Sequence, residues 1–218
     1  MGVRGIILKD REAWHDHRKK YIGGSDASAI VGMNPYMSNV KLWMIKTGQA
    51  EQEDISGKPY VQYGTAAESY LRELFKLDFP KYDVLYKENN SILNDKYPWA
   101  AASLDGILVE KETGRKGILE IKTTNILQSM QKEKWNEQIP DNYFVQILHY
   151  LMVTEFEFAV LKAQLKSEYD GLPYLQTRHY VIERSEVLED LEYLESEEKK
   201  FWECVKTGKQ PALKLPEI

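Results

Sequence analysis

Two neighbouring segments of the chain place charged residues among aliphatic ones. Residues 104–109 contain Asp105, and residues 117–122 contain Glu120 and Lys122. The segments predict a β-hairpin, and because side chains alternate along a strand, Glu120 and Lys122 share one face of it. A carboxylate and an amine among buried aliphatic side chains are costly unless they pair with each other or bind something. The hairpin therefore indicates either a buried ion pair or the metal site of a phosphodiesterase.

A third carboxylate, Glu68, lies in a segment with the periodicity of a helix. On that helix it shares a face with Gly64, Leu71 and Phe75, so the carboxylate lies on an apolar stripe. One interpretation is a residue at the edge of the stripe that pairs with Arg72. The other is a metal ligand that joins the two acids of the hairpin.

Three carboxylates and a lysine are suited to magnesium chemistry. Mg²⁺ prefers oxygen ligands and keeps several waters, so a few carboxylates suffice when a substrate phosphate completes its coordination. Two such ions can hold both the attacking and the leaving oxygen of a phosphodiester. Lys122 would orient or deprotonate the attacking water, or stabilise charge on the phosphate; burial lowers the pKa of such a lysine, and neighbouring carboxylates raise it. The alternative for Lys122 is a structural ion pair with Glu120 or Asp105.

Four further residues have side chains that bind phosphate or water. Ser25 follows two glycines at an expected helix start, where backbone N–H groups can bind an anion, and Arg18 lies just upstream. Gln146 and Tyr150 lie one turn apart on another expected helix, so they share a face. The alternatives are a simple helix cap at Ser25 and a polar pair satisfied within the core at Gln146 and Tyr150.

The elements that would position these residues follow from hydrophobic periodicity and from turn and cap residues. Helices are expected at 10–20, from about 23–26 onward, and at 38–47, 60–77, 141–153 and 185–206. Strands are expected at 82–87, 99–109, 117–123, 156–166 and 174–183, with a polar, irregular stretch that could hold one helical turn at 124–141. This order predicts an α/β or α+β fold with a mixed sheet flanked by helices. No repeat or linker divides the chain, so residues 1–218 are expected to form a single domain.

Composition excludes several kinds of protein and site. The single cysteine, Cys204, excludes an intrachain disulfide, a zinc knuckle and a four-cysteine iron–sulfur site. No apolar run approaches the ~18 residues of a membrane span, and the N-terminus lacks the apolar core of a signal peptide, so a cytoplasmic location is expected. The net charge of −5 argues weakly against nucleic-acid binding, but the first twenty residues are basic. Walker, nucleophile-elbow and dinucleotide-binding motifs are absent from the sequence.

Six segments, in one order along the chain, are similar to the motifs of a known family. They are Arg18 with residues 21–27, then residues 64–68, 103–106, 119–122, 146–150 and 179–184. A single motif such as Glu-x-Lys is weak, but the ordered set is specific. Together they resemble the lambda-exonuclease (YqaJ-type) viral recombinase group of the PD-(D/E)xK nuclease superfamily. Ser-Leu-Asp stands where the superfamily's name has Pro-Asp, a departure that this group tolerates.

The resemblance implies a restriction-endonuclease-like core, with a central mixed sheet flanked by helices, and a metal-dependent site. It assigns Asp105, Glu120 and the main-chain carbonyl of Ile121 to metal binding, and Lys122 to catalysis. Glu68 is similar to the family's helix-borne acid near the metal. The implied cofactor is Mg²⁺, as two ions in one site, with Mn²⁺ as a substitute.

The resemblance also implies how DNA is held. Arg18, Ser25 and Ser103 match positions that hold a terminal 5′ phosphate in the family, and Gln146 matches a further substrate-binding position, with Tyr150 on the same face. Family members form ring-shaped homotrimers that thread double-stranded DNA.

The implied activity is 5′-to-3′ degradation of linear double-stranded DNA, which leaves a 3′ single-stranded tail for a partner annealing protein. Such a protein would be encoded by a phage or prophage and would act in the bacterial cytoplasm. Two alternatives stay open: an endonuclease of the same fold, and a non-catalytic scaffold that binds DNA ends.

Overall fold

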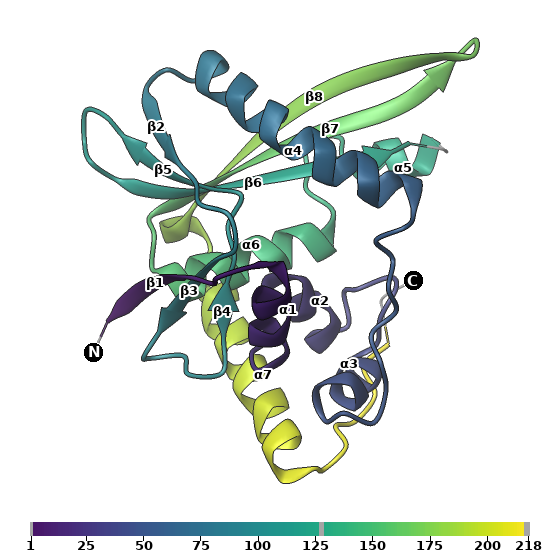
Figure 1. The fold of residues 1–218 in the computed structure, drawn as a ribbon, viewed down its shortest axis with the longest axis vertical. Helices are drawn as coiled ribbons and strands as arrows, with labels where there is room; N and C mark the ends of the chain where they lie inside the picture. Colours follow the sequence, from purple (N-terminus) through teal and green to yellow (C-terminus); the bar gives the residue numbers. More distant parts are fainter. Residues whose placement is uncertain (1, 127–128, 216–218) are drawn as a thin grey trace.

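The computed structural model describes residues 2–126 and 129–215. Along the chain, most of the helices and short strands come before the long strands of the main sheet. The last helix runs down one side of the molecule (Figure 1). In chain order the elements are β1 (Val3–Ile7), α1 (Arg11–Lys19), α2 (Gly24–Ile30), α3 (Asn39–Lys46), α4 (Pro59–Asp78), β2 (Tyr82–Leu85), β3 (Asn90–Asn94), β4 (Ala101–Ala102), β5 (Gly106–Glu110), β6 (Lys116–Asn125), α5 (Ser129–Glu133), α6 (Asp141–Thr154), β7 (Phe158–Tyr169), β8 (Leu172–Glu183) and α7 (Leu188–Thr207).

The main sheet confirms the mixed sheet flanked by helices that the sequence predicts. Among the described residues its strand order is β2-β5-β6-β7-β8. β6 and β7 are parallel, whereas β2–β5, β5–β6 and β7–β8 are antiparallel. Parallel neighbours need a crossover connection, and here α6 belongs to it. The long β7–β8 hairpin projects beyond the body of the molecule (Figure 1).

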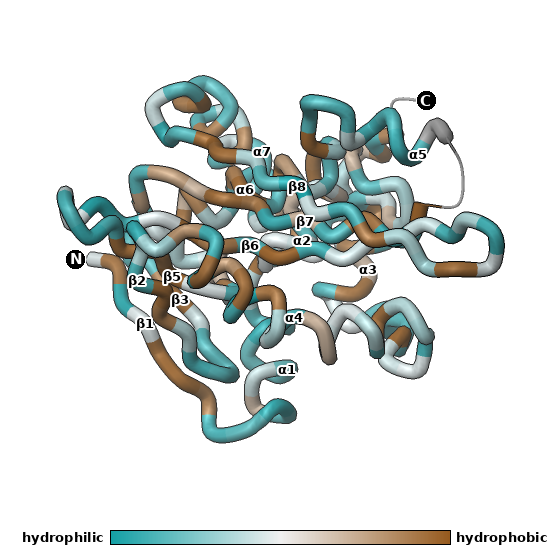
Figure 2. The backbone as a smooth tube through the Cα atoms, turned by 90° about the horizontal axis from the view of Figure 1, so that it is seen from above, coloured by the Kyte–Doolittle hydropathy of each residue, from teal (hydrophilic) through white to brown (hydrophobic). Residues whose placement is uncertain are grey.

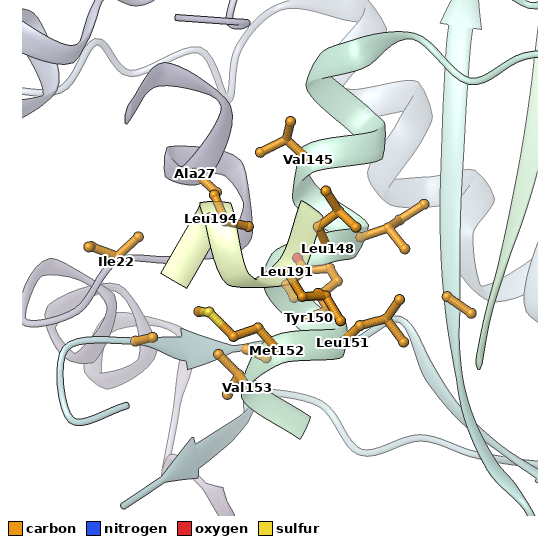
Figure 3. Close-up of a cluster of buried hydrophobic side chains, with 14 of the residues drawn as sticks. Ile22, Ala27, Val145, Leu148, Tyr150, Leu151, Met152, Val153, Leu191 and Leu194 are labelled. Atoms are coloured by element: carbon orange, nitrogen blue, oxygen red, sulfur yellow. The ribbon is translucent and has the colours of Figure 1, made fainter. Parts of the chain in front are cut away.

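The two faces of β6 contact different parts of the core. Leu119 and Ile121 pack with Leu71 and Phe75 of α4. Ile118 faces the other way, into the larger cluster that α2, α6 and α7 build (Figure 3). Glu120 is on that second face as well, where it contacts α6. The predicted alternation along the strand is therefore confirmed, and it directs Glu120 and Lys122 away from the aliphatic layer under α4.

The expected strand at 99–109 is wrong in one respect, because the chain changes sheets within it. Residues 101–102 form β4, which pairs with β3 in a separate small sheet of order β1-β3-β4, and residues 106–110 form β5 of the main sheet. Asp105 therefore lies in a bend just before β5 and not on the first strand of the hairpin. The passage from one sheet to the other places Ser103 and Asp105 between them.

Two strands of the small sheet were not expected from the sequence. β1 is a mostly exposed edge strand, and β3 has the nearly continuous burial that conceals an alternating pattern. Both strands are short and lie far apart in the sequence, and they are strands because they pair with each other. In the stretch expected to be irregular, α5 supplies the short helical segment, and residues 127 and 128 lie outside the described residues.

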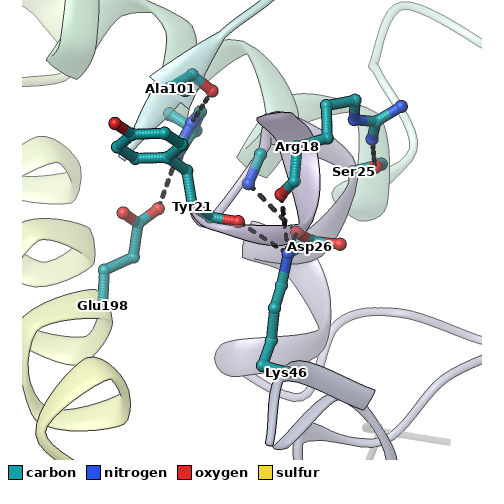
Figure 4. Close-up of polar contacts among 9 residues, drawn as sticks. Arg18, Tyr21, Ser25, Asp26, Lys46, Ala101 and Glu198 are labelled. Atoms are coloured by element: carbon teal, nitrogen blue, oxygen red, sulfur yellow. Dashed lines mark hydrogen bonds and ion pairs between the residues drawn. The ribbon is translucent and has the colours of Figure 1, made fainter. Parts of the chain in front are cut away.

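The last helix shows why its apolar stripe contains an acid. Glu198 is fully buried among Leu191, Leu194 and Phe201, and its carboxylate bonds the equally buried His149 of α6. The other ring nitrogen of His149 faces the carbonyl oxygen of Ala101 in β4, so α7, α6 and the small sheet are joined at one point (Figure 4). Hydrophobic and hydrophilic residues are mixed along α7 (Figure 2). Among the described residues, every helix is too short or too polar to cross a lipid bilayer.

A glycine sets the distance between α2 and α6. A Cβ atom at Gly24 would lie 2.5 Å from Cε1 of the Tyr150 ring. We therefore expect Gly24→Ala to lower the free energy of unfolding by roughly 1–3 kcal/mol despite the higher helix propensity of alanine, because the ring or the helix must shift. Urea unfolding measures this. Gly57→Ala is the control, since a Cβ there meets nothing within 4 Å, and its effect should stay within about 0.5 kcal/mol.

The His149 cluster predicts a pH-dependent contribution to stability. Its Nδ1 lies 2.6 Å from Glu198 Oε1 and its Nε2 lies 3.1 Å from Ala101 O, so both nitrogens donate only when the ring is protonated. Burial alone lowers the pKa of His149, but Glu198 outweighs burial and the pKa lies above its ordinary 6.5. A group whose pKa is raised in the folded state contributes its full stabilisation at pH values below its unfolded-state pKa. That contribution is lost as pH rises through the folded-state pKa.

We therefore expect the stability difference between wild type and His149→Gln to be largest at slightly acidic pH and to shrink toward alkaline pH. Chemical unfolding of both proteins across that range measures it. A difference that does not change with pH would show that the ring is not held as the cation.

Candidate active site

One cleft collects the side chains that the sequence singled out. It has a volume of about 280 Å³ and opens between α1, α2, α4, α6 and the passage between the two sheets. The predicted site residues that line it are Arg18, Ser25, Glu68, Ser103, Asp105, Glu120, Lys122, Gln146 and Tyr150. In the sequence these residues are spread over more than a hundred positions, and the fold brings them together in one cleft.

Asp105, from the bend before β5, and Glu120, from β6, meet at the deep end of the cleft. Oδ2 of Asp105 accepts a hydrogen bond from the backbone N–H of Ile121 at 2.8 Å, which holds the bend against β6. Glu120 is 2% exposed, and its Oε1 accepts from Lys122 Nζ at 2.5 Å and from Gln146 Nε2 at 2.8 Å. Gln146 Nε2 also lies 2.8 Å from the Tyr150 hydroxyl. The interpretations of Lys122 as an ion pair and of Gln146 with Tyr150 as an internally bonded pair both describe real contacts, and these contacts line the cleft.

Glu68 reaches the cleft from α4. Its carboxylate pairs with Arg72, as one of the two sequence interpretations has it. Arg72 in turn donates from Nε to the carbonyl oxygen of Asp105 at 2.6 Å, and its guanidinium lies 3.4 Å from the ring centroid of Tyr86. Gly64 allows this approach, because a Cβ there would lie 2.9 Å from Thr123 Oγ1 of β6. Arg72 thus links the carboxylate of Glu68 to the backbone of Asp105.

Burial and mutual repulsion disfavour the ionised form of all three carboxyl groups. Burial, and then repulsion from Asp105, raises the pKa of Glu120 to about 8. Burial raises the pKa of Asp105, and burial together with Asp105 raises that of Glu68. Burial alone lowers the pKa of Lys122, but Glu120 and Asp105 together raise it above the ordinary value. Lys122 is therefore a cation in this cluster, and a further positive charge beside the carboxyl groups would lower their pKa values and favour their ionised forms.

The donor set fits a hard divalent cation in part. Oε2 of Glu120 is buried without a hydrogen-bond partner among the described residues, which is the state expected of an oxygen that awaits a ligand. Within residues 2–126 and 129–215, however, no three Asp, Glu, His or Cys side chains are gathered as a ready metal-binding set. The arrangement therefore fits an ion held by few protein ligands, as Mg²⁺ is when water and substrate phosphate supply the rest.

The other end of the cleft is basic. The Arg18 guanidinium donates to Ser25 Oγ at 2.8 Å, and Trp14 Nε1 lies 3.1 Å from Ser103 Oγ. Arg11 and Arg18 both lie over the Trp14 ring, at 4.1 and 4.7 Å from its centroid. Arg18, Ser25 and Ser103 are thus brought together, as predicted, and Trp14 joins the two halves of the group.

A buried ion pair holds this basic end in place. Asp26 and Lys46 lie 2.8 Å apart, and Lys46 also donates to the carbonyl oxygens of Tyr21 and Arg18 (Figure 4). Asp26 Oδ2 accepts from the N–H of Gly23 at 3.0 Å. The N–H group of Gly23 is therefore already used by Asp26 and is not available to an anion.

Sequence reasoning missed several residues of the cleft, namely Arg11, Trp14, Asn89 and Asn90. Arg11, Trp14 and Arg18 are spaced by three and four residues along α1, which is the one signal that could have grouped them. Asn89 and Asn90 enter through the small sheet, for which the sequence carries no comparable signal.

Comparisons with known proteins show the family to which this chain is related. The family model of the YqaJ-like viral recombinase domain matches residues 13–157. The chain is 32% identical over 204 residues to YqaJ of Bacillus subtilis (strain 168), a protein described as uncharacterised; the match covers 93% of this chain and 59% of that protein. The chain thus spans less than two thirds of that curated relative.

The fold is similar to those of solved exonucleases. The alkaline exonuclease LHK-Exo from Laribacter hongkongensis matches with a TM-score of 0.66 and 18% identity, over 90% of this chain and 93% of the other. The same protein in complex with dAMP matches with a TM-score of 0.65 and 19% identity, over 90% and 93%. A phage-related exonuclease from Haemophilus somnus 129PT matches with a TM-score of 0.52 and 15% identity, over 86% and 96%.

The family match contains every residue that forms the cleft except Arg11, and it contains all the acids and the lysine of its deep end. The predicted resemblance is therefore confirmed, and the chain belongs to the YqaJ-like viral recombinase domain family.

Proposed function

We propose that this chain is a Mg²⁺-dependent exonuclease that degrades linear double-stranded DNA from its 5′ ends and leaves 3′ single-stranded tails. The observation that carries the proposal is the cleft itself. It joins a strained cluster of carboxylates and Lys122 at one end to a basic group around Arg18 at the other. A cation site beside an anion site is the combination that phosphodiester hydrolysis needs. The solved structure of LHK-Exo with dAMP supports the choice of substrate, since that protein shares the fold and binds a nucleotide.

The proposed metal ligands are Asp105, Glu120 and the main-chain carbonyl of Ile121, with Glu68 nearby. When bound, Mg²⁺ would supply Lewis-acid stabilisation of the phosphate and lower the pKa of a bound water; Mn²⁺ would substitute, and two ions could share the site. Arg72 holds Glu68 and the backbone of Asp105 in register. Gln146 donates to Oε1 of Glu120 and so orients the carboxylate, while Oε2 stays without a hydrogen-bond partner among the described residues.

Lys122 is proposed to act as a cation next to the reacting phosphate. Its ammonium group contacts Glu120 and lines the cleft, so it can stabilise negative charge that develops on the phosphate and orient the attacking water. The raised pKa of Lys122 supports the charged form in the free protein.

Arg18, Ser25 and Ser103 are proposed to hold the terminal 5′ phosphate. The Arg18 guanidinium donates to the Ser25 hydroxyl, so these two side chains lie together and can each donate to the same anion. Ser103, which lines the same cleft, adds a third donor. Recognition of an end phosphate is what would turn a nuclease of this fold into an exonuclease that starts at 5′ ends.

We also propose that the protein acts as a homotrimeric ring around DNA and delivers its 3′ tail to a single-strand annealing protein, in the cytoplasm of a bacterial host. The projecting β7–β8 hairpin supports an intermolecular contact, because Tyr169, Leu172 and Tyr174 near its tip are mostly exposed. Figure 2 shows hydrophobic residues in that projecting part of the chain. Isolated exposed apolar residues are common, whereas a group of them at one tip suggests a partner.

Substitution of the deep-end residues tests the catalytic assignment. We expect Lys122→Met and Asp105→Asn each to reduce nucleotide release from a linear duplex in Mg²⁺ by about 100-fold or more, since each removes a group that acts on the reacting phosphate or its metal. The matched controls are Lys116→Met, at the exposed start of β6, and Asp83→Asn, on the exposed side of β2. Both controls should retain the activity of the wild type.

Four outcomes would contradict the proposal. Wild-type protein that is inactive in both Mg²⁺ and Mn²⁺ would remove it, as would full activity of either deep-end variant. Cleavage of covalently closed circles would favour an endonuclease, and metal-independent binding of DNA ends without product would favour a scaffold.

The phosphate assignment makes a separate prediction. Wild-type protein should digest a 5′-phosphorylated duplex faster than the same duplex with a 5′ hydroxyl. Arg18→Gln should lower that ratio roughly tenfold, mostly through KM, because it removes a charge-assisted hydrogen bond to the phosphate. Lys20→Gln, one helical position past α1 and outside the cleft, is the control. An Arg18→Gln variant that retains the full 5′-phosphate preference would place the phosphate elsewhere.

A further inference from the structure

A second groove lies directly beside the cleft. It has a volume of about 240 Å³ and runs along the seam between the small sheet and the main sheet. Its lining is almost entirely apolar, with Ile6 and Ile7 from β1, Leu85 from β2, Ile92 from β3 and Ile107 from β5. Ile7 is 53% exposed and Leu85 55% exposed, so the groove presents large aliphatic side chains to solvent next to a strongly polar site.

The groove and the cleft share one wall. Tyr86, Asn90 and Leu104 line both of them. The Asn90 amide donates to the Leu104 carbonyl and accepts from the Leu104 N–H, each at 2.9 Å, so this wall is held from both sides. The carbonyl of Asn89 accepts from the N–H of Leu8 at 3.0 Å, which fixes β1 beside the same wall. These hydrogen bonds hold together the wall that separates the two cavities.

An unsatisfied polar group lies on the cleft side, one residue before Asn90 of the shared wall. Asn89 lines the cleft, and its Oδ1 is buried without a hydrogen-bond partner in the described part of the chain. Its backbone is in the left-handed region, with φ +53°, a conformation that asparagine tolerates better than most residues. A buried amide oxygen without a partner is costly, which is expected where a ligand supplies the missing donor.

The chemistry of the two cavities matches two parts of one nucleotide. If the basic end of the cleft holds the phosphate of a DNA end, the base of that nucleotide must lie within a few ångströms of it. A base that is still stacked and paired cannot follow its phosphate into a cleft of this size, so the terminal nucleotide must be unpaired. Unpaired bases are held by apolar and aromatic surfaces, with amide groups that bond their polar edges.

We propose that the seam groove holds the unpaired nucleobase of the 5′-terminal nucleotide. The inference rests on the proposed function, because the phosphate in the cleft is what brings the base to the groove. Tyr86, on the shared wall, and the aliphatic side chains of Ile7 and Leu85 form the apolar contact. Asn89, which lines the cleft one residue before Asn90 of that wall, accepts a hydrogen bond from an amino group on the edge of the base that faces the cleft. Lys87, at the lip of the groove, lies where a neighbouring phosphate would pass.

The test compares two 5′-phosphorylated duplexes that differ only in the terminal nucleotide, which is intact in one and abasic in the other. Binding is measured by fluorescence anisotropy, and digestion in Mg²⁺ is measured in parallel. Wild-type protein should bind the abasic end about tenfold more weakly, the size expected when the contacts of one base are lost. Leu85→Gln should bind the intact end about tenfold more weakly than wild type does, and should bind the abasic end as wild type does.

Leu77→Gln is the matched control, because Leu77 is a 76% exposed leucine on α4 that lies outside both cavities. It should bind both duplexes as wild type does. Ile7→Thr is a second groove variant that keeps a β-branched residue in β1, so the result does not depend on the folding of one protein.

The outcomes separate the two proposals. Wild-type protein that binds and digests both duplexes equally well overturns the groove assignment and leaves the exonuclease intact. Equal losses for Leu85→Gln and Leu77→Gln also overturn it. Wild-type protein that binds neither duplex overturns the proposed function and the groove assignment with it.

Discussion

The buried carboxylate of Glu120 is the constraint on which the rest of the structure depends. A charge that is almost fully removed from water is tolerated only when donors or counter-charges surround it. Lys122 and Gln146 supply donors to one oxygen, and the other oxygen lacks a partner among the described residues. Asp105 lies close enough to raise the pKa of Glu120 further. The folded protein thus disfavours the ionised form of this carboxyl group, and binding of a cation beside it would favour that form.

The surrounding elements keep that cluster in one geometry. β6 presents Glu120 and Lys122 to the same side, the bend before β5 is bonded to β6 through Asp105, and α6 brings Gln146 over the strand. α6 is itself placed by the close contact between Gly24 and the Tyr150 ring and by the buried pair of His149 and Glu198. The same helix therefore connects the core, the acidic end of the cleft and α2, which carries Ser25 of the basic end.

Much of the candidate site could be predicted because its chemistry is local in the sequence. Asp105, Glu120 and Lys122 lie within eighteen residues of one another in the sequence, Glu68 interrupts an apolar helical stripe, and Gln146 and Tyr150 are one turn apart, so periodicity alone indicated which of the side chains on regular elements share a face. The resemblance to a family added Ser103, which no local pattern distinguishes. The break in the expected strand at 99–109 could not be predicted, because either sheet accepts such a sequence and only pairing with β3 or β6 decides where each part belongs.

The amino-acid sequence was therefore sufficient for the mixed sheet, the order of most elements, the family and the residue types of the deep end of the cleft. These depend on short-range periodicity and on motifs that can be seen without knowing which distant segments meet. The small sheet, the contact of Trp14 with Ser103 and the wall that Tyr86, Asn90 and Leu104 form between two cavities depend on contacts between residues that are far apart in the chain. Such contacts arise only when the whole core packs, because the burial that stabilises them is shared by many elements at once.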